Sequence, residues 1–363
     1  MSDRLFDQQQ PLALADQGCF FVGGTYVETP QVRISGGQMY VQYQIPARQT
    51  HPYPVVMIHG GGQTGVNFLG TPDGRHGWAD YFVANGYAVY VVDQPSRGRS
   101  GFISQIYGES AIRGAEAVAE RFTAPENAKL WPQAHLHTQW PGSGVAGDAV
   151  FDQFYASQVE SMTDVGAGEL MMREAGSALL DRIGPAIFLT HSQSGPLGWT
   201  IADARPKLVK GIVAVEPNGA PVYEIKFAGA PGWFEDDVIS RPWGITRHRL
   251  TFSPTVADAS ELRFVKQDKP DGPGLLPCWL QAEPARQLVN LQGIPILIVT
   301  AEASYHAAYD HGTSLFLKQA GVAHTFTRLA DIGIRGNGHM MMLEKNNLQI
   351  AAYFDQWLEA NVK

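Results

Sequence analysis

Five short segments that are apolar almost throughout constrain the fold of this chain most strongly. They are PVVMIHG (54–60), YAVYVVDQ (87–94), AIFLTHS (186–192), GIVAVEP (211–217) and PILIVTAE (295–302). A strand covered on one face alternates apolar and polar residues, whereas a strand covered on both faces is apolar along its length, as in parallel sheets. These segments therefore predict a parallel sheet with helices on both faces.

The stretches between these strands predict helices at 77–85, 194–204 and 310–319, followed by a final amphipathic helix at 343–361. The segment QMYVQYQIP (38–46) alternates as a half-exposed strand does, so antiparallel strands are expected to lead into the sheet. Strands alternating with helices indicate the α/β class with a mostly parallel central sheet.

Two segments interrupt this alternation. The first, about 102–166, contains an expected helix around 110–120 and then LWPQAHLHTQWPGSG; the second, about 220–290, is dense in Pro, Gly and Trp. Long excursions after strand ends are where an α/β scaffold places its binding loops. With 363 residues, of which 44% are hydrophobic, the chain can form one large domain. We expect a single domain spanning 1–363, with two cap insertions.

Charge and cysteine content narrow the class of partner. The formal net charge is −8, which disfavours a nucleic-acid partner. The start, MSDRLFDQQQPLALADQG, has acidic residues and no apolar run, and no later stretch approaches the ~18 apolar residues of a membrane span. We therefore expect a cytoplasmic protein with no membrane partner, and a homodimer stays open.

Cys19 and Cys278 exclude a disulfide framework and favour two reduced thiols, with one bridge as the alternative.

The segment PVVMIHGGGQTG places Gly60, Gly62 and Gly65 in G-x-G-x-x-G order directly after a strand. This pattern raises a dinucleotide-binding turn. However, TPDG follows where a helix would have to continue, and two strands precede this one, so we disfavour a nucleotide site. In the alternative interpretation, His-Gly-Gly-Gly forms a loop whose free amides hold a developing oxyanion, as in many ester hydrolases.

The segment THSQSG follows another strand and offers two serines as nucleophile. A sharp strand-to-helix turn needs small residues two positions before and two after the nucleophile, hence the pattern G-x-S-x-G. Centred on Ser192, those positions hold Thr190 and Ser194, which are small but not glycine. Centred on Ser194, the second position would be Pro196. Ser192 is the better candidate, and a polar loop without catalysis is the alternative.

A serine nucleophile needs a histidine base and a carboxylate that orients it, in the order Ser, acid, His in this fold. His339 lies in GIRGNGHMMM before the last helix, where the base is expected, whereas His306, His311 and His324 are interpreted as surface or packing residues. For the acid, Glu216 ends the strand after the nucleophile. Glu302 follows the next strand and is the weaker alternative.

Taken together, DQPSRGRSG, THSQSG, VEPNG and GNGHMMM resemble the α/β-hydrolase branch typified by the bacterial esterase 713. Carried over residue by residue, the resemblance implies Ser192 as nucleophile, His339 as base and Glu216 as acid. It also implies the amides of Gly61 and Gln193 as oxyanion donors. The triple-glycine loop departs from that relative, which has a Cys pair after His-Gly.

These residues predict a serine hydrolase that cleaves a small carboxylic ester or lactone through an acyl-enzyme, with no metal or organic cofactor. Two alternatives stay open: a non-hydrolytic lyase or isomerase on the same scaffold, and a catalytically silent binding protein.

The insertions carry the residues that bear on substrate choice. Five tryptophans lie in them, and they either line an apolar pocket or pack the insertions on the core: Trp131, Trp140, Trp233, Trp243 and Trp279. The segment RPWGITRHRL groups Arg241, Arg247, His248 and Arg249, which we interpret as a solvated basic stretch rather than a carboxylate site. Gln63 and Gln94 lie near strand ends and are candidate lining residues.

Overall fold

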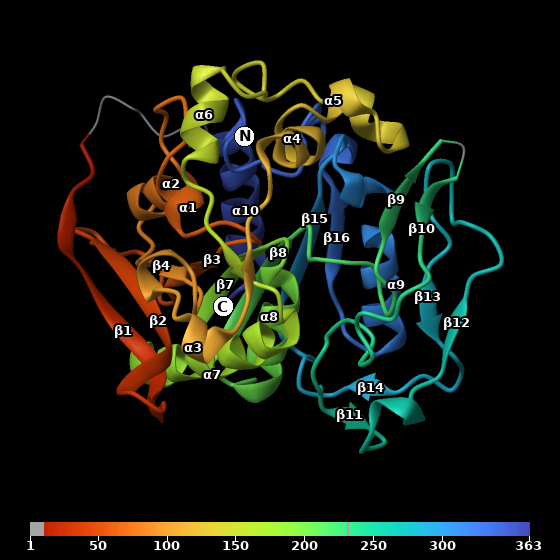
Figure 1. The fold of residues 1–363 in the computed structure, drawn as a ribbon, viewed down its shortest axis with the longest axis horizontal. Coiled ribbons are helices and arrows are strands. Elements are labelled where there is room, and N and C mark those ends of the chain that lie inside the picture. Colours follow the sequence, from red (N-terminus) through yellow and green to blue (C-terminus); the bar gives the residue numbers. More distant parts are fainter. Residues whose placement is uncertain (1–10, 231) are drawn as a thin grey trace.

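An eight-stranded sheet forms the centre of the computed structural model, which describes residues 11–230 and 232–363. Its strands, in spatial order, are β1 (Leu14–Glu28), β2 (Arg33–Pro46), β4 (Val89–Asp93), β3 (Val55–Ile58), β7 (Ala186–His191), β8 (Val209–Val215), β15 (Ile296–Thr300) and β16 (Thr325–Arg328) (Figure 1). The β1–β2 and β2–β4 pairs are antiparallel, and all later neighbours are parallel. The expected α/β-hydrolase fold, with antiparallel strands leading into a mostly parallel sheet, is confirmed.

The central strands are buried because both faces of the sheet are covered. Every residue of β3, β7 and β15 is buried, which accounts for their uninterrupted apolar sequences. One hydrophobic core joins the sheet to α2 (Trp78–Ala84) and α10 (Asn347–Asn361). A second core, on the other face, joins it to α7 (Val165–Ile183), α8 (Ser194–Ala204) and α9 (Asp310–Gln319).

Three helices differ from the sequence-based expectation. The longest described helix, α7, is not singled out by the sequence pattern because three glycines interrupt its apolar periodicity. The last helix begins at Asn347 rather than near residue 343. The helix expected around 110–120 is wrong in extent: Ser110–Ala111 is the short strand β5, and the helical part is α4 (Ala115–Val118), which continues as a π-helical turn at Ala119–Thr123.

The first insertion carries most of the remaining short helices, and residues 115–155 of it lie above the sheet in Figure 1. Its elements are α3 (Ser104–Tyr107), β5, α4, α5 (Pro125–Ala128), α6 (Ala149–Tyr155) and β6 (Ser161–Met162), which pairs with β5. A further short helix, α1 (Val66–Leu69), precedes α2. The insertion packs on the core through buried side chains such as Val118, Phe122 and Trp131.

The second insertion runs along the right side of Figure 1 as short two-stranded ribbons. These pair β9 (Lys226–Gly229) with β10 (Trp233–Glu235), β11 (Phe252–Ser253) with β14 (Gln287–Leu288), and β12 (Phe264–Lys266) with β13 (Trp279–Gln281). The two insertions therefore reach the sheet from different sides.

Two further features of the described residues bear on the sequence predictions. Cys19 and Cys278 are both free, the first exposed and the second buried. Across 11–230 and 232–363, none of the helices combines the length and apolar character needed to cross a bilayer. The first ten residues of the segment on which the absence of a secretory signal was argued lie outside the described part of the chain.

Candidate active site

Ser192 lies on the sharp turn between β7 and α8, at the carboxyl edge of the sheet. Its φ is +56°, a left-handed conformation that costs a non-glycine residue about 1–3 kcal/mol and marks functional turns. The turn is fixed on both sides: the Ser192 amide donates to the Val215 carbonyl at 3.0 Å, and the Ser192 carbonyl accepts from the amides of Gly195 and Asn218. The backbone therefore holds this side chain at the end of the sheet.

The two small residues that flank Ser192 are buried inside the turn. Ser194 is fully buried, and its hydroxyl donates to the Ile58 carbonyl at 2.6 Å while accepting from the His191 amide at 2.7 Å. Thr190 is also fully buried, and a Cβ at Gly198 would lie 3.1 Å from its methyl group. Small size is thus required at both positions, and glycine is not.

His339 and Glu216 form a buried hydrogen-bonded pair beside Ser192. The Nδ1 atom of His339 lies 2.5 Å from Oε2 of Glu216, and neither side chain is more than 1% exposed. Glu216 accepts two further hydrogen bonds, from the Ala301 amide at 2.8 Å and the Ser304 hydroxyl at 2.7 Å. Nδ1 therefore carries the hydrogen of this bond, which leaves Nε2 of His339 free to accept a proton.

Burial sets the electrostatics of this pair. It lowers the pKa of His339 well below its usual range, and the neighbouring His191, His306 and Arg113 act in the same direction. Burial and the charge of Asp310 raise the pKa of Glu216, against the hydrogen bonds from Ala301 and Ser304. A neutral imidazole at neutral pH is the form that a general base requires.

The alternative acid, Glu302, lies elsewhere. Its carboxylate pairs with Arg335 at 2.7 Å and accepts from the Gly336 amide at 2.9 Å, so it supports the loop that precedes His339. Ser304, two positions after Glu302, donates its hydroxyl hydrogen to Glu216.

The triple-glycine loop after β3 packs directly against the Ser192 turn. A Cβ at Gly60 would lie 3.1 Å from both the Cβ of Ser192 and Nδ1 of His191, so only glycine fits without a shift. A Cβ at Gly61 would lie 3.4 Å from Oε1 of Gln193, which places these two residues side by side. Within the described part of the chain, no residue accepts a hydrogen bond from the amide of Gly61 or of Gln193.

Arg97 supports the turn from behind. Its Nη2 donates to Oε1 of Gln193 at 3.1 Å, and the residue is only 4% exposed. Burial lowers the pKa of Arg97 to about 10, so it stays charged at neutral pH. This buried positive charge, beside free amides at the N-terminus of α8, favours negative charge near Ser192.

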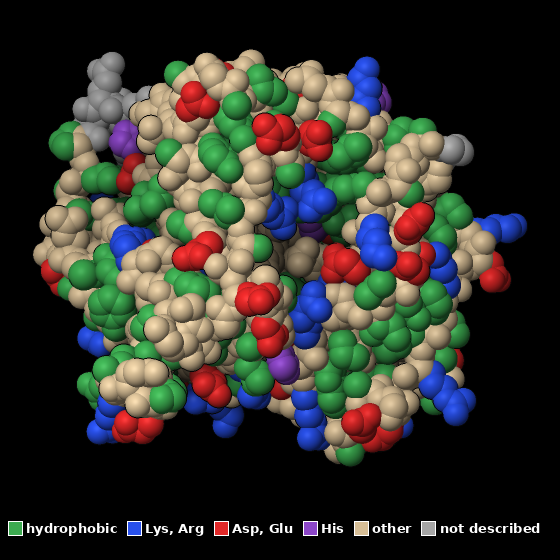
Figure 2. Space-filling model, in the orientation of Figure 1, with side chains coloured by type: hydrophobic (Ala, Val, Ile, Leu, Met, Phe, Trp, Pro, Cys, Tyr) green, Lys and Arg blue, Asp and Glu red, His purple; other side chains and the backbone are tan. Residues whose placement is uncertain are grey.

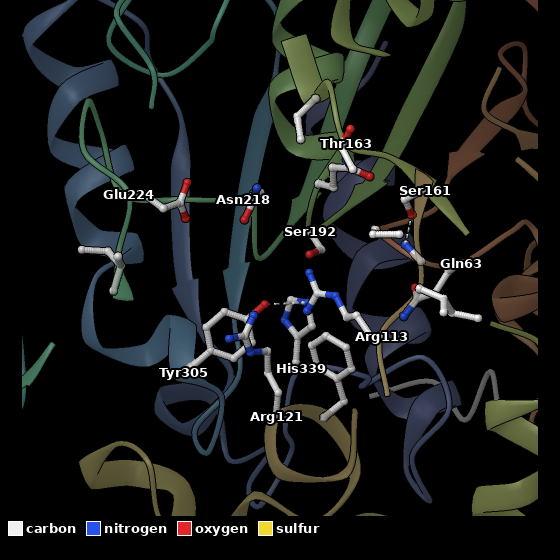
Figure 3. Close-up of a pocket in the computed structure, with 18 of the residues that line it drawn as sticks. Gln63, Arg113, Arg121, Ser161, Thr163, Ser192, Asn218, Glu224, Tyr305 and His339 are labelled. Carbon is white, nitrogen blue, oxygen red and sulfur yellow. Dashed lines mark hydrogen bonds between the residues drawn. The ribbon is translucent and has the colours of Figure 1, made fainter. Parts of the chain in front are cut away.

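Ser192 and His339 open into a cavity of about 430 Å³. Figure 3 shows both side chains pointing into it, with Arg113 and Arg121 close by and Glu224 on the opposite side. The lining also includes Gly61, Gln63, Gln193, Asn218, Phe227 and Arg247, and it contains no tryptophan. Of the two interpretations left open for the tryptophans, an apolar pocket lined by them does not describe this cavity.

The tryptophans pack the insertions, as the alternative interpretation held. Trp131 is buried, stacks on Phe227 at a ring-centroid distance of 5.5 Å and donates to the Ala303 carbonyl at 2.9 Å. Trp140 is buried against Phe154, and Trp279 stacks on Tyr223. The cavity is nevertheless more polar than an apolar ester site, because charged side chains line it alongside the rings of Phe and Tyr residues.

Comparison with known proteins assigns the family. No family model matches the chain. It is 47% identical over 347 residues to the probable secreted lipase phiG of Fungal sp. (strain ATCC 74256), covering 94% of this chain and 88% of that protein. The chain belongs to the lipase and esterase family of α/β-hydrolases. A bacterial esterase solved at atomic resolution aligns with 98% of this α/β-hydrolase and 98% of its own length, at 25% identity and a TM-score of 0.66.

The expected activity is confirmed by these relatives: this α/β-hydrolase is a serine hydrolase that cleaves carboxylic esters. The expected cytoplasmic location is wrong, because the fungal relative is named a secreted protein, which points to the extracellular space. The expectation relied on the acidic start without an apolar run and on the lack of a stretch long enough to span a membrane, and neither feature identifies the compartment in which the protein acts.

Three residues around His339 in this hydrolase were not recognised in the sequence as parts of the site. The Tyr305 hydroxyl lies 3.2 Å from Nε2 of His339, and Tyr305 lines the same cavity as Ser192. His306 stacks on His339 at 4.9 Å, and Nε2 of His191 lies 3.0 Å from the His339 carbonyl oxygen. A sequence signal existed for two of them, since SYH (304–306) follows β15 at the edge that carries Ser192.

The other candidate residues serve structural roles. His311 contacts Cys278 at 3.3 Å, His324 contacts the Ser314 hydroxyl, and Gln94 donates to the His59 carbonyl. In the basic segment Arg241 is buried and pairs with Glu224 at 3.2 Å, so the interpretation as a solvated stretch is wrong for this residue, whereas Arg249 is exposed.

Two groups of side chains in the described residues could offer ligands to a metal. Glu216, His306 and His339 place one ligand atom each within 4.8 Å of one another, as do His51, Asp355 and Glu359. In the first group, Nδ1 of His339 is already bonded to Glu216 and Nδ1 of His306 to Asp310. These hydrogen bonds fit an acid–base pair better than a metal centre.

Proposed function

We propose that Ser192 is the nucleophile of this ester hydrolase, with His339 as general base and Glu216 as the carboxylate that orients it. The observation that carries the proposal is the 2.5 Å contact between His339 Nδ1 and Glu216, at the sheet edge where Ser192 occupies a left-handed turn. Nucleophile, orienting acid and base follow one another in this order along the chain, and they are the components that acyl transfer requires.

The reaction follows from these positions. Ser192 Oγ attacks the ester carbonyl as its proton moves to Nε2 of His339, and the Glu216 carboxylate stabilises the imidazolium. The amides of Gly61 and Gln193 are proposed to hold the tetrahedral oxyanion. The C–O bond then breaks, His339 returns the proton to the leaving alcohol, and water releases the acyl group by the same steps.

Tyr305 fits this scheme as a neighbour of the transferred proton. Burial raises the pKa of Tyr305, so its hydroxyl stays protonated at neutral pH and can donate or accept a hydrogen bond. In the free protein it lies 3.2 Å from His339 Nε2. A substrate carbonyl arriving at Ser192 would therefore enter a cavity that the Tyr305 hydroxyl also lines.

The two insertions, about 102–166 and 220–290, are proposed to act as the cap that closes this cavity within a single domain. The first supplies Arg113, Arg121 and Phe122, and the second supplies Glu224 and Phe227. A cavity of about 430 Å³ suits a small ester or lactone, and the fungal relative's name as a lipase makes a longer acyl chain the alternative. We also propose that the protein acts outside the cell, as that name implies for the relative.

Covalent labelling tests the nucleophile. A fluorophosphonate should modify Ser192, identified by mass spectrometry, and Ser192→Ala should lose labelling and about three or more orders of magnitude of ester turnover. Ser194→Ala is the matched comparison: it removes a buried hydroxyl with three hydrogen bonds, so it should lower stability yet retain labelling at Ser192. Retention of most activity by Ser192→Ala would disprove the assignment.

A further inference from the structure

Two arginines of the first insertion face the cavity in front of Ser192 and His339. Figure 3 shows Arg113 and Arg121 beside these side chains, and both line the same cavity. They rest on aromatic rings: Arg121 Cζ lies 4.7 Å from the ring centroid of Phe227, and Arg113 Cζ lies 5.5 Å from that of Phe122. The rings fix the guanidinium groups without neutralising them.

Neither guanidinium has a carboxylate partner among the described residues, although 35 acidic residues occur in the chain. The other arginines near the cavity differ. Arg241 pairs with Glu224 at 3.2 Å, and Arg247 donates to the Ser240 carbonyl at 2.9 Å and lies 3.8 Å from Glu224. The arginines on the Glu224 side of the cavity are therefore close to a carboxylate, whereas Arg113 and Arg121 on the other side are not.

The carboxylate of Glu224 does not offset this charge. It is held by Arg241 and by the Ser240 hydroxyl at 2.9 Å, on the side of the cavity opposite Arg113 and Arg121. In Figure 2 both basic and acidic side chains border the central hollow, so attraction of an anion depends on the guanidinium groups that line the cavity without a carboxylate partner. Unpaired positive charge in a cleft raises the local concentration of anionic ligands.

Two cations held close together repel each other, and a bound anion relieves this repulsion. Burial lowers the pKa of Arg113, and the charge of Arg121 acts in the same direction. Nothing in the ester chemistry at Ser192 needs two free guanidinium groups, because the oxyanion has the Gly61 and Gln193 amides. The arginines are therefore available for a part of the substrate that does not react.

We propose that Arg113 and Arg121 form a carboxylate-binding subsite, so that the preferred substrate is an ester or lactone with a free carboxylate near the scissile carbonyl. A planar guanidinium binds the two oxygens of a carboxylate through paired, charge-assisted hydrogen bonds. The inference rests on the proposed function, because it takes Ser192 as the point of attack and the arginines as the point of recognition.

Matched substrates test the subsite. Monoethyl adipate carries a carboxylate that ethyl hexanoate lacks, and ethanol release from both is compared at pH 8, where His339 is neutral. Wild type should prefer the hemiester, and added salt should reduce the preference. Arg113→Gln and Arg121→Gln should each lower kcat/KM for monoethyl adipate about 10- to 100-fold more than for ethyl hexanoate, mainly through KM.

Arg205→Gln is the matched control, because this exposed arginine pairs with Asp181 away from the cavity and should leave both rates unchanged. Equal losses on both esters in the Arg113 and Arg121 variants, or a salt-independent wild type without preference, would overturn the subsite. In either case wild type would still turn over ethyl hexanoate and label at Ser192. Loss of labelling and of turnover on both esters by wild type would instead refute the proposed function.

Discussion

A buried histidine links the first insertion to the loop that carries His339, and it offers a quantitative test of the structure. His137 Nδ1 lies 2.8 Å from Glu126, and its Nε2 lies 2.8 Å from Glu344, with the His137 side chain 1% exposed. Glu344 also accepts from the Gly338 amide at 2.8 Å, next to His339. These two ion pairs therefore fix the end of the loop that carries His339.

The magnitude follows from the pKa of His137. Burial alone would lower it, but hydrogen bonds to Glu126 and Glu344 outweigh burial and raise the pKa from 6.5 to about 9. The folded protein thus holds this proton more tightly than the unfolded chain. The stabilisation is complete below about pH 6.5 and is lost as pH rises through about 9. At 1.36 kcal/mol per pKa unit it amounts to about 3 kcal/mol.

His137→Gln removes this stabilisation. Urea unfolding of both proteins, followed by tryptophan fluorescence at pH 6 and pH 10, should show the stability difference shrinking by about 3 kcal/mol at the higher pH. His135→Gln changes an exposed histidine two positions earlier, so it is the control and should leave the pH dependence of unfolding as in wild type. A His137→Gln difference that is the same at both pH values would refute the reasoning.

Three further results are expected from the site. Glu216→Gln should lower kcat about 10⁴-fold because it disturbs the His339 tautomer, whereas Glu302→Gln should stay within about tenfold of wild type; similar losses would contradict the choice of acid. Gly60→Ala should lower kcat about 10- to 100-fold, since its Cβ would press on Ser192 at 3.1 Å, while Gly168→Ala, which meets no neighbour within 4 Å, should not; equal rates would contradict the packing. Burial lowers the pKa of His339, and the base must be neutral to accept a proton. The value of kcat/KM for a neutral ester should therefore be constant from pH 6.5 to 8.5 and should fall only below pH 6.5. A fall in kcat/KM that is centred at pH 7 or above would contradict this.

The sheet could be predicted because a strand that is covered on both faces is apolar along its whole length. Four strands, β3, β4, β7 and β15, each lie within one of the apolar segments, and β8 overlaps the segment 211–217. The Ser192 turn was also predictable, since its constraint is local: a strand, a small residue on either side, and a helix. In contrast, α7 lies in a segment whose glycines hide its apolar periodicity, so tertiary packing rather than local pattern defines that helix.

For Glu216, the sequence predicts the position of the residue but not all of its hydrogen-bond partners. Its position at the end of β8 could be predicted from the sequence. In the structure its Oε2 atom lies 2.5 Å from Nδ1 of His339, which is 123 residues further along the chain. The groups that donate hydrogen bonds to Glu216 could not be predicted from the sequence. The positions of the Ala301 amide and the Ser304 hydroxyl depend on where β15 ends relative to β8. Register between neighbouring strands decides such contacts, and sequence alone does not state it.

The charge of the cavity was the least predictable feature, and the reason is the irregular backbone of the first insertion. Arg113 precedes α4, and Arg121 lies in the π-helical turn that extends it, eight positions later. On a regular helix, eight residues are slightly more than two turns, so a continuous helix would also align the two side chains. Yet α4 begins only at Ala115, which leaves Arg113 outside the helix. Their common direction therefore depends on the π-helical turn and on the packing of Phe122 beneath it, at a ring-centroid distance of 5.3 Å from His339. The same segment thus places the Phe122 ring against the proposed base, His339, and two guanidinium groups in the lining of the cavity. One short segment of the first insertion therefore contributes both to the cap and to the proposed substrate-binding site.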